Sequence, residues 1–312
     1  MPSQKDVKDR ISSVRNVHQI TRAMEMVAAA RLRKAQKRIE ALRPYAEAIR
    51  KMTRRAVGAA ESIPNLPILE EHDSIDRVGI LLVTGDRGLA GPFNSQIVRA
   101  GTRRGREVES DGPSVVWYAS GKRGASTLGF RGLEVAASFS GFTDRPQYSD
   151  ARDIAQTLIA AYTDGNIDRL EIFYNGFVSA LNQEVRHETL LPLQQAQLLD
   201  GGDDDEDDED GGDEDATEDA EGHDQGRSLW IYEPDPEEIL KRLAPDFVEI
   251  SIYRALLEST ASEHGARMTA MRSASDNASE LLDDLQLEAN RQRQADITQE
   301  LLEIVAGAEA LR

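Results

Sequence analysis

The stretch "RISSVRNVHQITRAMEMVAAARLRKAQ", residues 10–36, decides the fold. Its apolar residues recur at steps of four and three, as in Ile20, Met24 and Val27, which is typical of a helix that packs along one seam against a partner helix. The pattern continues from about residue 7 to residue 57. Fifty residues of helix span roughly 75 Å, which is too long for a compact domain to cover. This helix therefore needs a partner.

The other end of the chain predicts a second long helix. It covers residues 247–311, after a short helix that Pro245 is expected to break, whereas Pro44 is expected to kink the first helix without ending it. The seam of the second helix consists of mostly small side chains, some of them polar. Between Ala289 and Ile297 the step is eight residues, so the apolar stripe turns to a different side. The last twenty or so residues are therefore expected to leave the N-terminal helix.

Charge is distributed unevenly along the chain, whose formal net charge is −19. Residues 1–58 hold 15 Lys and Arg against 5 Asp and Glu, whereas residues 233–312 hold 8 against 17. The two ends are thus oppositely charged, which favours their association although each exposed pair contributes little. Residues 200–226 carry 16 Asp and Glu and no Lys or Arg. Such a block cannot bury enough apolar surface to order itself, so it predicts a disordered loop.

The spacing of apolar residues changes in the middle of the chain. Short runs rich in β-branched and aromatic residues alternate with two helical segments, which is typical of a parallel α/β sheet. The expected strands are 77–83, 114–119 and 169–177, with closing strands at 183–193 and 228–234, and the expected helices are 91–105 and 151–165.

The sequence therefore predicts an α+β fold, in which the N- and C-terminal helices form a long antiparallel coiled coil and a Rossmann-like α/β domain is inserted between them. The predicted parts are the N-terminal helix at 1–58, the α/β domain at 75–234 with its acidic loop at 200–226, and the short and long C-terminal helices at 235–312. Pairing of each end with another chain is the alternative. The opposite charges and similar lengths of the two helices favour self-pairing.

Composition narrows the class of protein. The absence of Cys excludes a disulfide framework and thiolate metal sites, and it suits a reducing cytoplasm. No stretch approaches the ~18 consecutive apolar residues of a membrane span. The five His are scattered and form no HxxxH or HExxH pairing, so no metal site is predicted. The first residues lack an apolar signal core, and a cytoplasmic location is expected.

Two glycine-containing loops invite a nucleotide-binding interpretation. "GDRGLAG" (85–91) lacks the GxGxxG order, and Asp86 would repel a pyrophosphate. "ASGKRGAS" (119–126) contains Gly-Lys, but Val116 stands where a P-loop requires Gly. The first loop is interpreted as a tight strand-to-helix turn, nucleotide binding is rejected for the second, and no cofactor is predicted. A nucleotide-binding regulator with coiled-coil arms is the alternative function, and a coiled-coil scaffold is a third.

Three stretches resemble the γ subunit of the F-type ATP synthase: residues 10–36, "GDRGLAGPFN" (85–94) and "ARMTAMRSASDNASELLDDLQLEANRQRQADITQELLEIVAGAEAL" (266–311). They cover both ends and the middle in the family's order, while the long acidic loop departs from the family. The resemblance implies a non-catalytic rotor shaft that couples proton translocation to ATP synthesis. The implied partners are the α and β subunits of the F1 ring, the ε subunit and the c-ring of Fo, at the cytoplasmic face of the cell membrane.

The resemblance also implies residues that touch other subunits. The expected contacts of the shaft with β subunits are Met24, Asp86, Arg87, Ala90, Arg267, Gln294, Thr298 and Glu300. Trp230 and Tyr232 match the foot region that meets the c-ring and ε. Without the resemblance, Met24 would be interpreted as core filling and Arg267 as a surface charge. The acidic loop is interpreted as a solvated segment or, more sharply, as a regulator of rotation that touches basic loops of ε or the c-ring.

Overall fold

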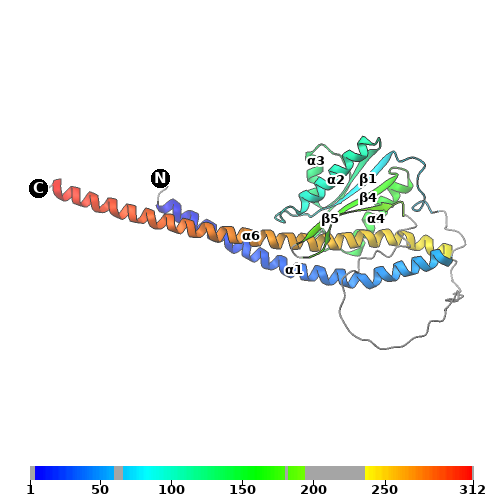
Figure 1. Ribbon diagram of the computed structural model, residues 1–312, viewed down its shortest axis with the longest axis horizontal. Helices are drawn as coiled ribbons and strands as arrows, with labels where there is room; N and C mark the ends of the chain where they lie inside the picture. The colour runs from blue at the N-terminus through cyan, green and yellow to red at the C-terminus, as the bar shows by residue number, and fades with distance from the viewer. Residues whose placement is uncertain (1–3, 60–65, 180–181, 194–235, 311–312) are drawn as a thin grey trace, which may run out of the picture.

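The computed structural model describes residues 4–59, 66–179, 182–193 and 236–310. Two helices, α1 (Gln4–Ala59) and α6 (Pro236–Ala310), run side by side in opposite directions and form a rod (Figure 1). An α/β domain lies beside one end of this rod. The predicted antiparallel pairing of the two ends of the chain is thereby confirmed. The acidic block 200–226 and the strand expected at 228–234, which carries Trp230 and Tyr232, lie outside the described residues.

The rod is held along a seam of small and apolar side chains. Leu32 and Ala35 of α1 pack against Ala261 of α6, with Met268 beside them. Leu285, farther along α6, is also buried. Because several of these side chains are small, the two helices approach each other closely. Val7, near the start of α1, is buried as well, so the rod is a two-helix coiled coil that extends to the start of α1, opposite about residue 293 of α6.

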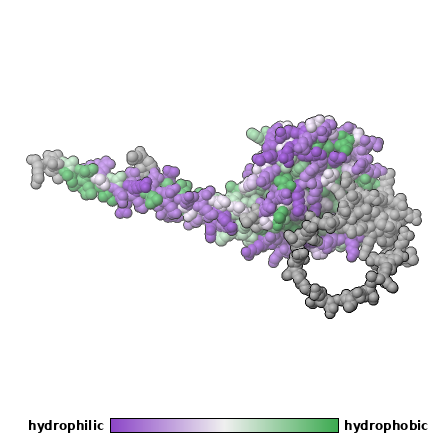
Figure 2. Space-filling model, viewed as in Figure 1, coloured by the Kyte–Doolittle hydropathy of each residue, from purple (hydrophilic) through white to green (hydrophobic). Residues whose placement is uncertain are grey.

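Beyond about residue 293, α6 continues past the start of α1 as a single helix (Figure 1). Its large apolar side chains there are 45–68% exposed: Ile297, Leu301, Leu302, Ile304 and Val305. Figure 2 shows these apolar groups near the free end of the rod. The prediction that the last stretch leaves α1 is confirmed, and we call this part of α6, residues 294–310, the overhang. No helix in the described part of the chain has the length and apolarity that crossing a membrane requires.

Neither long helix ends at its internal proline. Pro44 lies inside α1, but the predicted break at Pro245 is wrong, because α6 continues through it. A proline removes one backbone hydrogen bond and crowds the preceding turn. Here Leu243 and Ala244 before the proline and Val248 after it are all buried. Packing on both sides of Pro245 therefore holds the helix in one piece, since tertiary contacts supply most of the stability of a helix in a protein.

The α/β domain contains a five-stranded sheet in the order β3-β2-β1-β4-β5. Its strands are β1 (Arg77–Val83), β2 (Ser114–Ser120), β3 (Val135–Phe139), β4 (Arg169–Phe177) and β5 (Gln183–Leu191), and its helices are α2 (Phe93–Ser110), α3 (Lys122–Phe130) and α4 (Tyr148–Thr163). The first four strands are parallel and β5 is antiparallel to β4. The Rossmann-like prediction is confirmed, although β3 and α3 were not predicted.

Helices cover both faces of the sheet. On one face, α4 and the first half of α6 pack against the strands, and Ile252 and Leu256 of α6 share a buried cluster with Leu81 and Ile172. On the other face, α2 and α3 pack around a second cluster that includes Ile97. The helix α6 thus belongs both to the core of the α/β domain and to the rod. The candidate functional site lies at the junction of these two parts.

Candidate functional site

At the junction, α6 lies across the carboxyl ends of β1 and β4. Ser262 donates a hydrogen bond to the carbonyl oxygen of Asn175 in β4 (3.1 Å). Glu263 lies over Gly85, just after β1, so closely that a Cβ added to Gly85 would be 2.8 Å from the carboxylate. In open α/β sheets, ligands bind at this edge, where the strand order reverses. In this protein the chain's own helix occupies that crevice.

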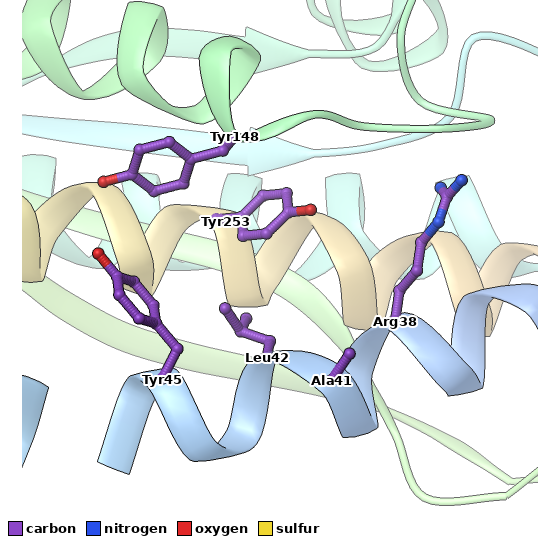
Figure 3. A pocket seen from close by; sticks show the side chains of 6 residues that line it. All are labelled: Arg38, Ala41, Leu42, Tyr45, Tyr148 and Tyr253. Atoms are coloured by element: carbon purple, nitrogen blue, oxygen red, sulfur yellow. The ribbon is translucent and has the colours of Figure 1, made fainter. Parts of the chain in front are cut away.

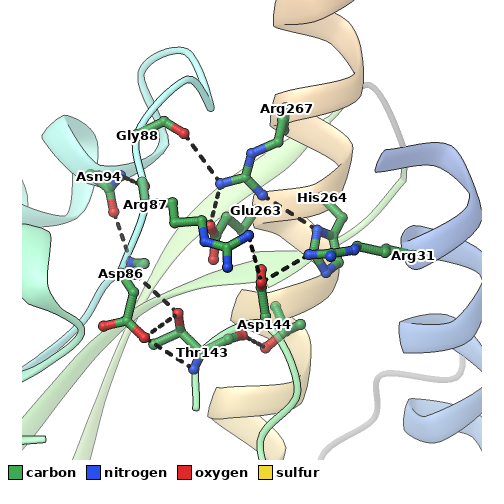
Figure 4. Close-up of polar contacts among 12 residues, drawn as sticks. Arg31, Asp86, Arg87, Gly88, Asn94, Thr143, Asp144, Glu263, His264 and Arg267 are labelled. Carbon is green, nitrogen blue, oxygen red and sulfur yellow. Dashed lines mark hydrogen bonds and ion pairs between the residues drawn. The ribbon is translucent and has the colours of Figure 1, made fainter. Parts of the chain in front are cut away.

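The carboxylate of Asp86 fastens together the loops that follow three parallel strands (Figure 4). It accepts hydrogen bonds from the backbone N–H groups of Lys122 (3.0 Å) and Gly141 (2.8 Å) and from the hydroxyl of Thr143 (3.0 Å). Lys122 is the first residue of α3, and a helix N-terminus is a common place for a phosphate or another anion. Asp86 already places a negative charge there, which agrees with the interpretation of this loop as a structural turn.

A buried ion pair on α6 anchors the loop after β1. Arg267, which is 8% exposed, donates hydrogen bonds to Glu263 (2.5 Å) and to the carbonyl oxygen of Gly88 (3.3 Å) (Figure 4). Burial raises the pKa of Glu263, although the charge of Arg267 opposes this shift. Burial and the charge of Arg267 lower the pKa of His264 to about 4. At neutral pH His264 is therefore uncharged, and the charged contact is made by Arg267.

Asp144 connects this loop to α1. Its carboxylate lies 2.8 Å from the guanidinium of Arg31 in α1 and 3.1 Å from that of Arg87 (Figure 4). Burial raises the pKa of Asp144, but the hydrogen bond from Arg31 and the positive charges of both arginines outweigh burial and lower it. One carboxylate in the loop after β3 thus touches the rod and the loop after β1 at the same time.

The α1 helix meets the α/β domain a second time, around a cavity of about 360 Å³ (Figure 3). The rings of Tyr148, at the start of α4, and Tyr253 of α6 meet edge to face with centroids 5.7 Å apart. Burial and a hydrogen bond with Glu249 raise the pKa of Tyr148. The cavity is lined by Arg38, Ala41, Leu42 and Tyr45 of α1 together with these two tyrosines. The junction therefore combines a polar clamp with an aromatic contact.

Another buried carboxylate lies on the α2 side of the sheet. Glu171 of β4 is 1% exposed, accepts two hydrogen bonds of 3.0 Å from Arg104 and lies 2.8 Å from the ring nitrogen of His187. Burial raises the pKa of Glu171, but the bonds with His187 and Arg104 outweigh burial and bring the pKa to about 2. This cluster ties α2 to β4 and β5 and serves the stability of the domain.

The three loop residues predicted to contact β subunits differ in their surroundings. Asp86 is bonded within the chain as described above, Ala90 is 2% exposed, and Arg87 is exposed and pairs with Asp144. The residue that the sequence analysis missed is Leu89, which is 64% exposed and has a φ of 62°. This backbone conformation is uncommon for a residue other than glycine. Leu89 is the large apolar side chain that this loop presents to its surroundings.

The other predicted β contacts form two groups on the long helices. Met24 is half-buried in α1 and Arg267 is buried at the junction, whereas Gln294, Thr298 and Glu300 are exposed on the overhang. The hydroxyl of Thr298 donates a hydrogen bond to the carbonyl oxygen of Gln294, one turn earlier (2.9 Å). Roughly 40 Å of helix separates Arg267 from Gln294. The structure thus arranges these residues along a rod and does not gather them into one pocket.

Sequence comparisons find relatives over the whole chain. The model of a family described as ATP synthase matches residues 3–311. A protein named ATP synthase gamma chain from Moorella thermoacetica is 40% identical over 313 residues, covering 100% of each chain. Another of that name, from Streptomyces coelicolor, is 42% identical over 310 residues, covering 97% of this chain and 94% of the relative.

Solved structures with the same arrangement are also found. A chain in the Euglena gracilis mitochondrial ATP synthase, in a structure of OSCP, F1 and the c-ring, matches with a TM-score of 0.65 and 18% identity, covering 99% of this chain and 94% of that chain. A chain in the central stalk and c-ring of the Tetrahymena thermophila mitochondrial ATP synthase matches with a TM-score of 0.57 and 24% identity, covering 82% and 99%. At sequence identities of 18% and 24%, these structural similarities show the fold alone.

Proposed function

This chain belongs to the ATP synthase gamma-chain family, and we propose on that premise that it is the central rotor shaft of an F1Fo ATP synthase. It is a non-catalytic subunit that transmits torque between the membrane c-ring and the catalytic α3β3 ring, and so couples ion translocation to ATP synthesis. The observation that carries the proposal is a two-helix rod fixed at one end to an α/β domain and free at the other as a single helix (Figure 1).

The mechanical demands on a shaft agree with this architecture. Two helices packed along their length resist bending and twisting better than one. Torque that enters at the α/β domain must reach the rod without slack, and α6 meets this demand because Ile252 and Leu256 are part of the core of the domain. The pair of Glu263 and Arg267 then fastens the next turns of α6 to the loop after β1.

The overhang suits a position inside the α3β3 ring. A bearing that turns against a surrounding sleeve needs side chains that make modest contacts, since one strong contact would trap a single angle. Gln294, Thr298 and Glu300 are exposed there, and we assign them to hydrogen bonds with β subunits that form and break as the shaft turns. Each of these bonds contributes about 1 kcal/mol net.

The predicted contacts near the junction divide into two kinds. Met24 and Arg87 retain exposed surface and are proposed to touch β subunits directly. Asp86, Ala90 and Arg267 are bonded or buried within the chain, and they are proposed to act by holding the loop that a β subunit meets. The α/β domain is proposed to be the foot that binds ε and the c-ring at the cytoplasmic face of the cell membrane. Trp230 and Tyr232 are proposed to belong to that foot.

Affinity purification from membranes tests the proposal. A tag on this chain is expected to recover α and β subunits in three copies each, together with ε and the c-ring, and the recovered complex is expected to hydrolyse ATP. A matched strain with the same tag on an unrelated cytoplasmic protein controls for non-specific recovery. Recovery of the chain without α and β subunits would contradict the rotor function.

Isothermal titration of the isolated chain with ATP and with NAD tests the alternative, a nucleotide-binding regulator. We expect no tight site, because Glu263 of α6 lies over Gly85 in the crevice where such a fold binds its ligand. A Kd in the micromolar range for either nucleotide would favour the regulator.

A further inference from the structure

The two helices of the rod are attached to the α/β domain in different ways. The first half of α6 is bonded directly to the sheet and its loops: Arg254 pairs with Glu188 of β5 (2.7 Å), and Thr260 donates a hydrogen bond to the carbonyl oxygen of Thr143 (2.9 Å). The α1 helix instead lies mainly on α6, along a seam of small and apolar side chains. Because α1 is attached mainly through this seam, other contacts are needed to prevent it from sliding along α6.

The apolar seam alone does not determine this position. A slip of α1 by seven residues along α6 brings Ala35 to the place of Ala28 and Ile39 to the place of Leu32. Each exchange replaces one apolar side chain with a similar one, so a coiled coil tolerates it. In coiled coils the alignment is commonly specified by a few polar or charged residues instead.

Two ion pairs near the middle of α1 specify its alignment on α6. Glu25 is bonded to Arg272 of α6 (2.9 Å), and the side chain of Glu25 is largely buried. Six residues later, Arg31 is bonded to Asp144 in the loop after β3 (2.8 Å). The first pair thus connects α1 to α6, and the second connects α1 to the α/β domain.

The two pairs together discriminate against slips in both directions. A slip that brings Arg38 opposite Asp144 would preserve one pair but would place Leu32 opposite Arg272. The opposite slip would place His18 opposite Arg272 and Met24 opposite Asp144, and both pairs would be lost. Only the observed alignment satisfies both.

We propose that the pairs Glu25–Arg272 and Arg31–Asp144 lock the alignment of α1 on α6, so that α1 turns with the α/β domain under load. These four residues are positioning residues, and the inference rests on the proposed rotor function. Without these two ion pairs, α1 slides along its seam of small side chains. Part of each rotation then moves α1 along α6 and does not turn it with the α/β domain.

Disulfide trapping in the assembled complex measures the alignment directly, because the chain has no Cys of its own. Ala35→Cys with Ala261→Cys joins residues that pack together in the observed alignment. Leu42→Cys or Ala28→Cys with Ala261→Cys reports a slip of seven residues in either direction. In an otherwise native chain, we expect the first pair to cross-link at least ten times more completely than the other two.

The test variant reverses both charges on α1, Glu25→Arg with Arg31→Glu, which leaves the net charge of α1 unchanged. We expect cross-linking of a slipped pair to rise at least fivefold, and proton pumping per ATP hydrolysed in inverted vesicles to fall at least twofold. Adding Arg272→Glu restores an opposite charge beside residue 25 and is expected to restore both readouts in part; Asp144 is kept because it also pairs with Arg87. Glu40→Arg with Arg43→Glu, two exposed residues of α1, is the matched control and is expected to change neither.

The outcomes separate the inference from the function on which it rests. If the reversed variant cross-links only in the observed alignment, or slips while pumping normally, the lock is wrong. If the native complex neither contains α and β subunits nor pumps, the rotor function is wrong, while the cross-links still decide the alignment. Should the reversed variant fail to assemble, Glu25→Gln with Arg31→Gln removes the attractions without adding repulsion and is judged by the same two readouts.

Discussion

Asp86 determines the local architecture of three loops with one side chain. Asp86 follows β1, and its carboxylate receives hydrogen bonds from Lys122, which follows β2, and from Gly141 and Thr143, which follow β3. In related architectures an anionic ligand occupies such a place. Here the charge is covalently part of the chain, so the loops are held in the same way whether or not another molecule is present. The site is thus suited to rigidity.

Gly121 should be the least replaceable glycine of this region. It adopts a φ of 95°, and a Cβ there would collide with the backbone oxygen of Thr84. We expect Gly121→Ala to destabilise the isolated chain by about 3 kcal/mol in urea unfolding. Gly129→Ala is the matched control, because no atom lies within 4 Å of its added Cβ, and it should leave stability unchanged or raise it slightly. Equal stabilities of the two variants would contradict the close approach.

Glu171 should make stability depend on pH in a defined window. Its pKa falls from an ordinary value of 4.5 to about 2, so its contribution is fully present above pH 4.5 and is lost as the pH falls towards 2. We expect Glu171→Gln to cost about 2 kcal/mol at pH 7, with the difference from the native chain shrinking below pH 4.5. Thermal melting at pH 7, 4 and 3 measures this.

The control for this series is Glu107→Gln. Glu107 is exposed and lies 3.8 Å from Arg104, so its replacement should change stability by less than about 0.5 kcal/mol. A deficit of Glu171→Gln that stays the same at every pH would show that the ionised carboxylate is not what stabilises the cluster.

The roles of single residues were harder to predict than their positions. The sequence predicts that Asp86 lies in a turn, but its partners come from two other loops, and Asp144 lies 113 residues from Arg31. Such pairings depend on where loops meet in space, which no local pattern records. Arg267 was expected to point outward, yet it is buried because Glu263, one turn earlier, lies beneath it. Leu89 carries no sequence signal of its exposure.

At the scale of elements, α6 changes its environment along its length. Around Ile252 it is buried on several sides, around Met271 it shares one seam with α1, and beyond about residue 293 it is a single exposed helix. An isolated helix without a partner is only marginally stable in water. The three parts should therefore differ in local stability although they form one continuous element.

Hydrogen–deuterium exchange of the isolated chain should resolve these three parts. We expect amides of residues 248–267 to exchange slowest, those of 268–285 at intermediate rates and those of 297–306 within seconds to minutes. Peptide-level mass spectrometry measures this, with α4 as the internal reference for a buried helix. Equal protection along the whole of α6 would contradict the assignment of the overhang as unpartnered.

Strong patterns were sufficient to predict most elements. The strands 77–83 and 169–177 were predicted with the bounds that the structure shows, because dense β-branched and aromatic runs mark them. The strand β3, "VAASF", has small residues, and α3, "KRGASTLGF", contains two glycines; both signals are weak and both elements were missed. The break expected at Pro245 was wrong because burial of its neighbours outweighed a local preference.

For the whole molecule, the rod dominates the shape in solution. A helix of 75 residues is about 110 Å long, whereas a compact protein of 312 residues has a radius of gyration of about 20 Å. Small-angle X-ray scattering of the isolated chain should therefore give a maximum dimension above about 110 Å. Truncation after Arg293 should shorten it by roughly 25 Å. An unchanged maximum dimension after truncation would mean that the overhang folds back.

The two halves of the rod stand at opposite ends of the sequence, and this has a consequence for biosynthesis. On the ribosome α1 emerges first, and its partner is complete only about 250 residues later. At ~5–20 residues per second, this interval lasts roughly ten to fifty seconds. Throughout it, the apolar seam of α1 is open to other nascent chains and to chaperones. Translation of the final 75 residues therefore sets the earliest moment at which a finished rod can be handed to assembly.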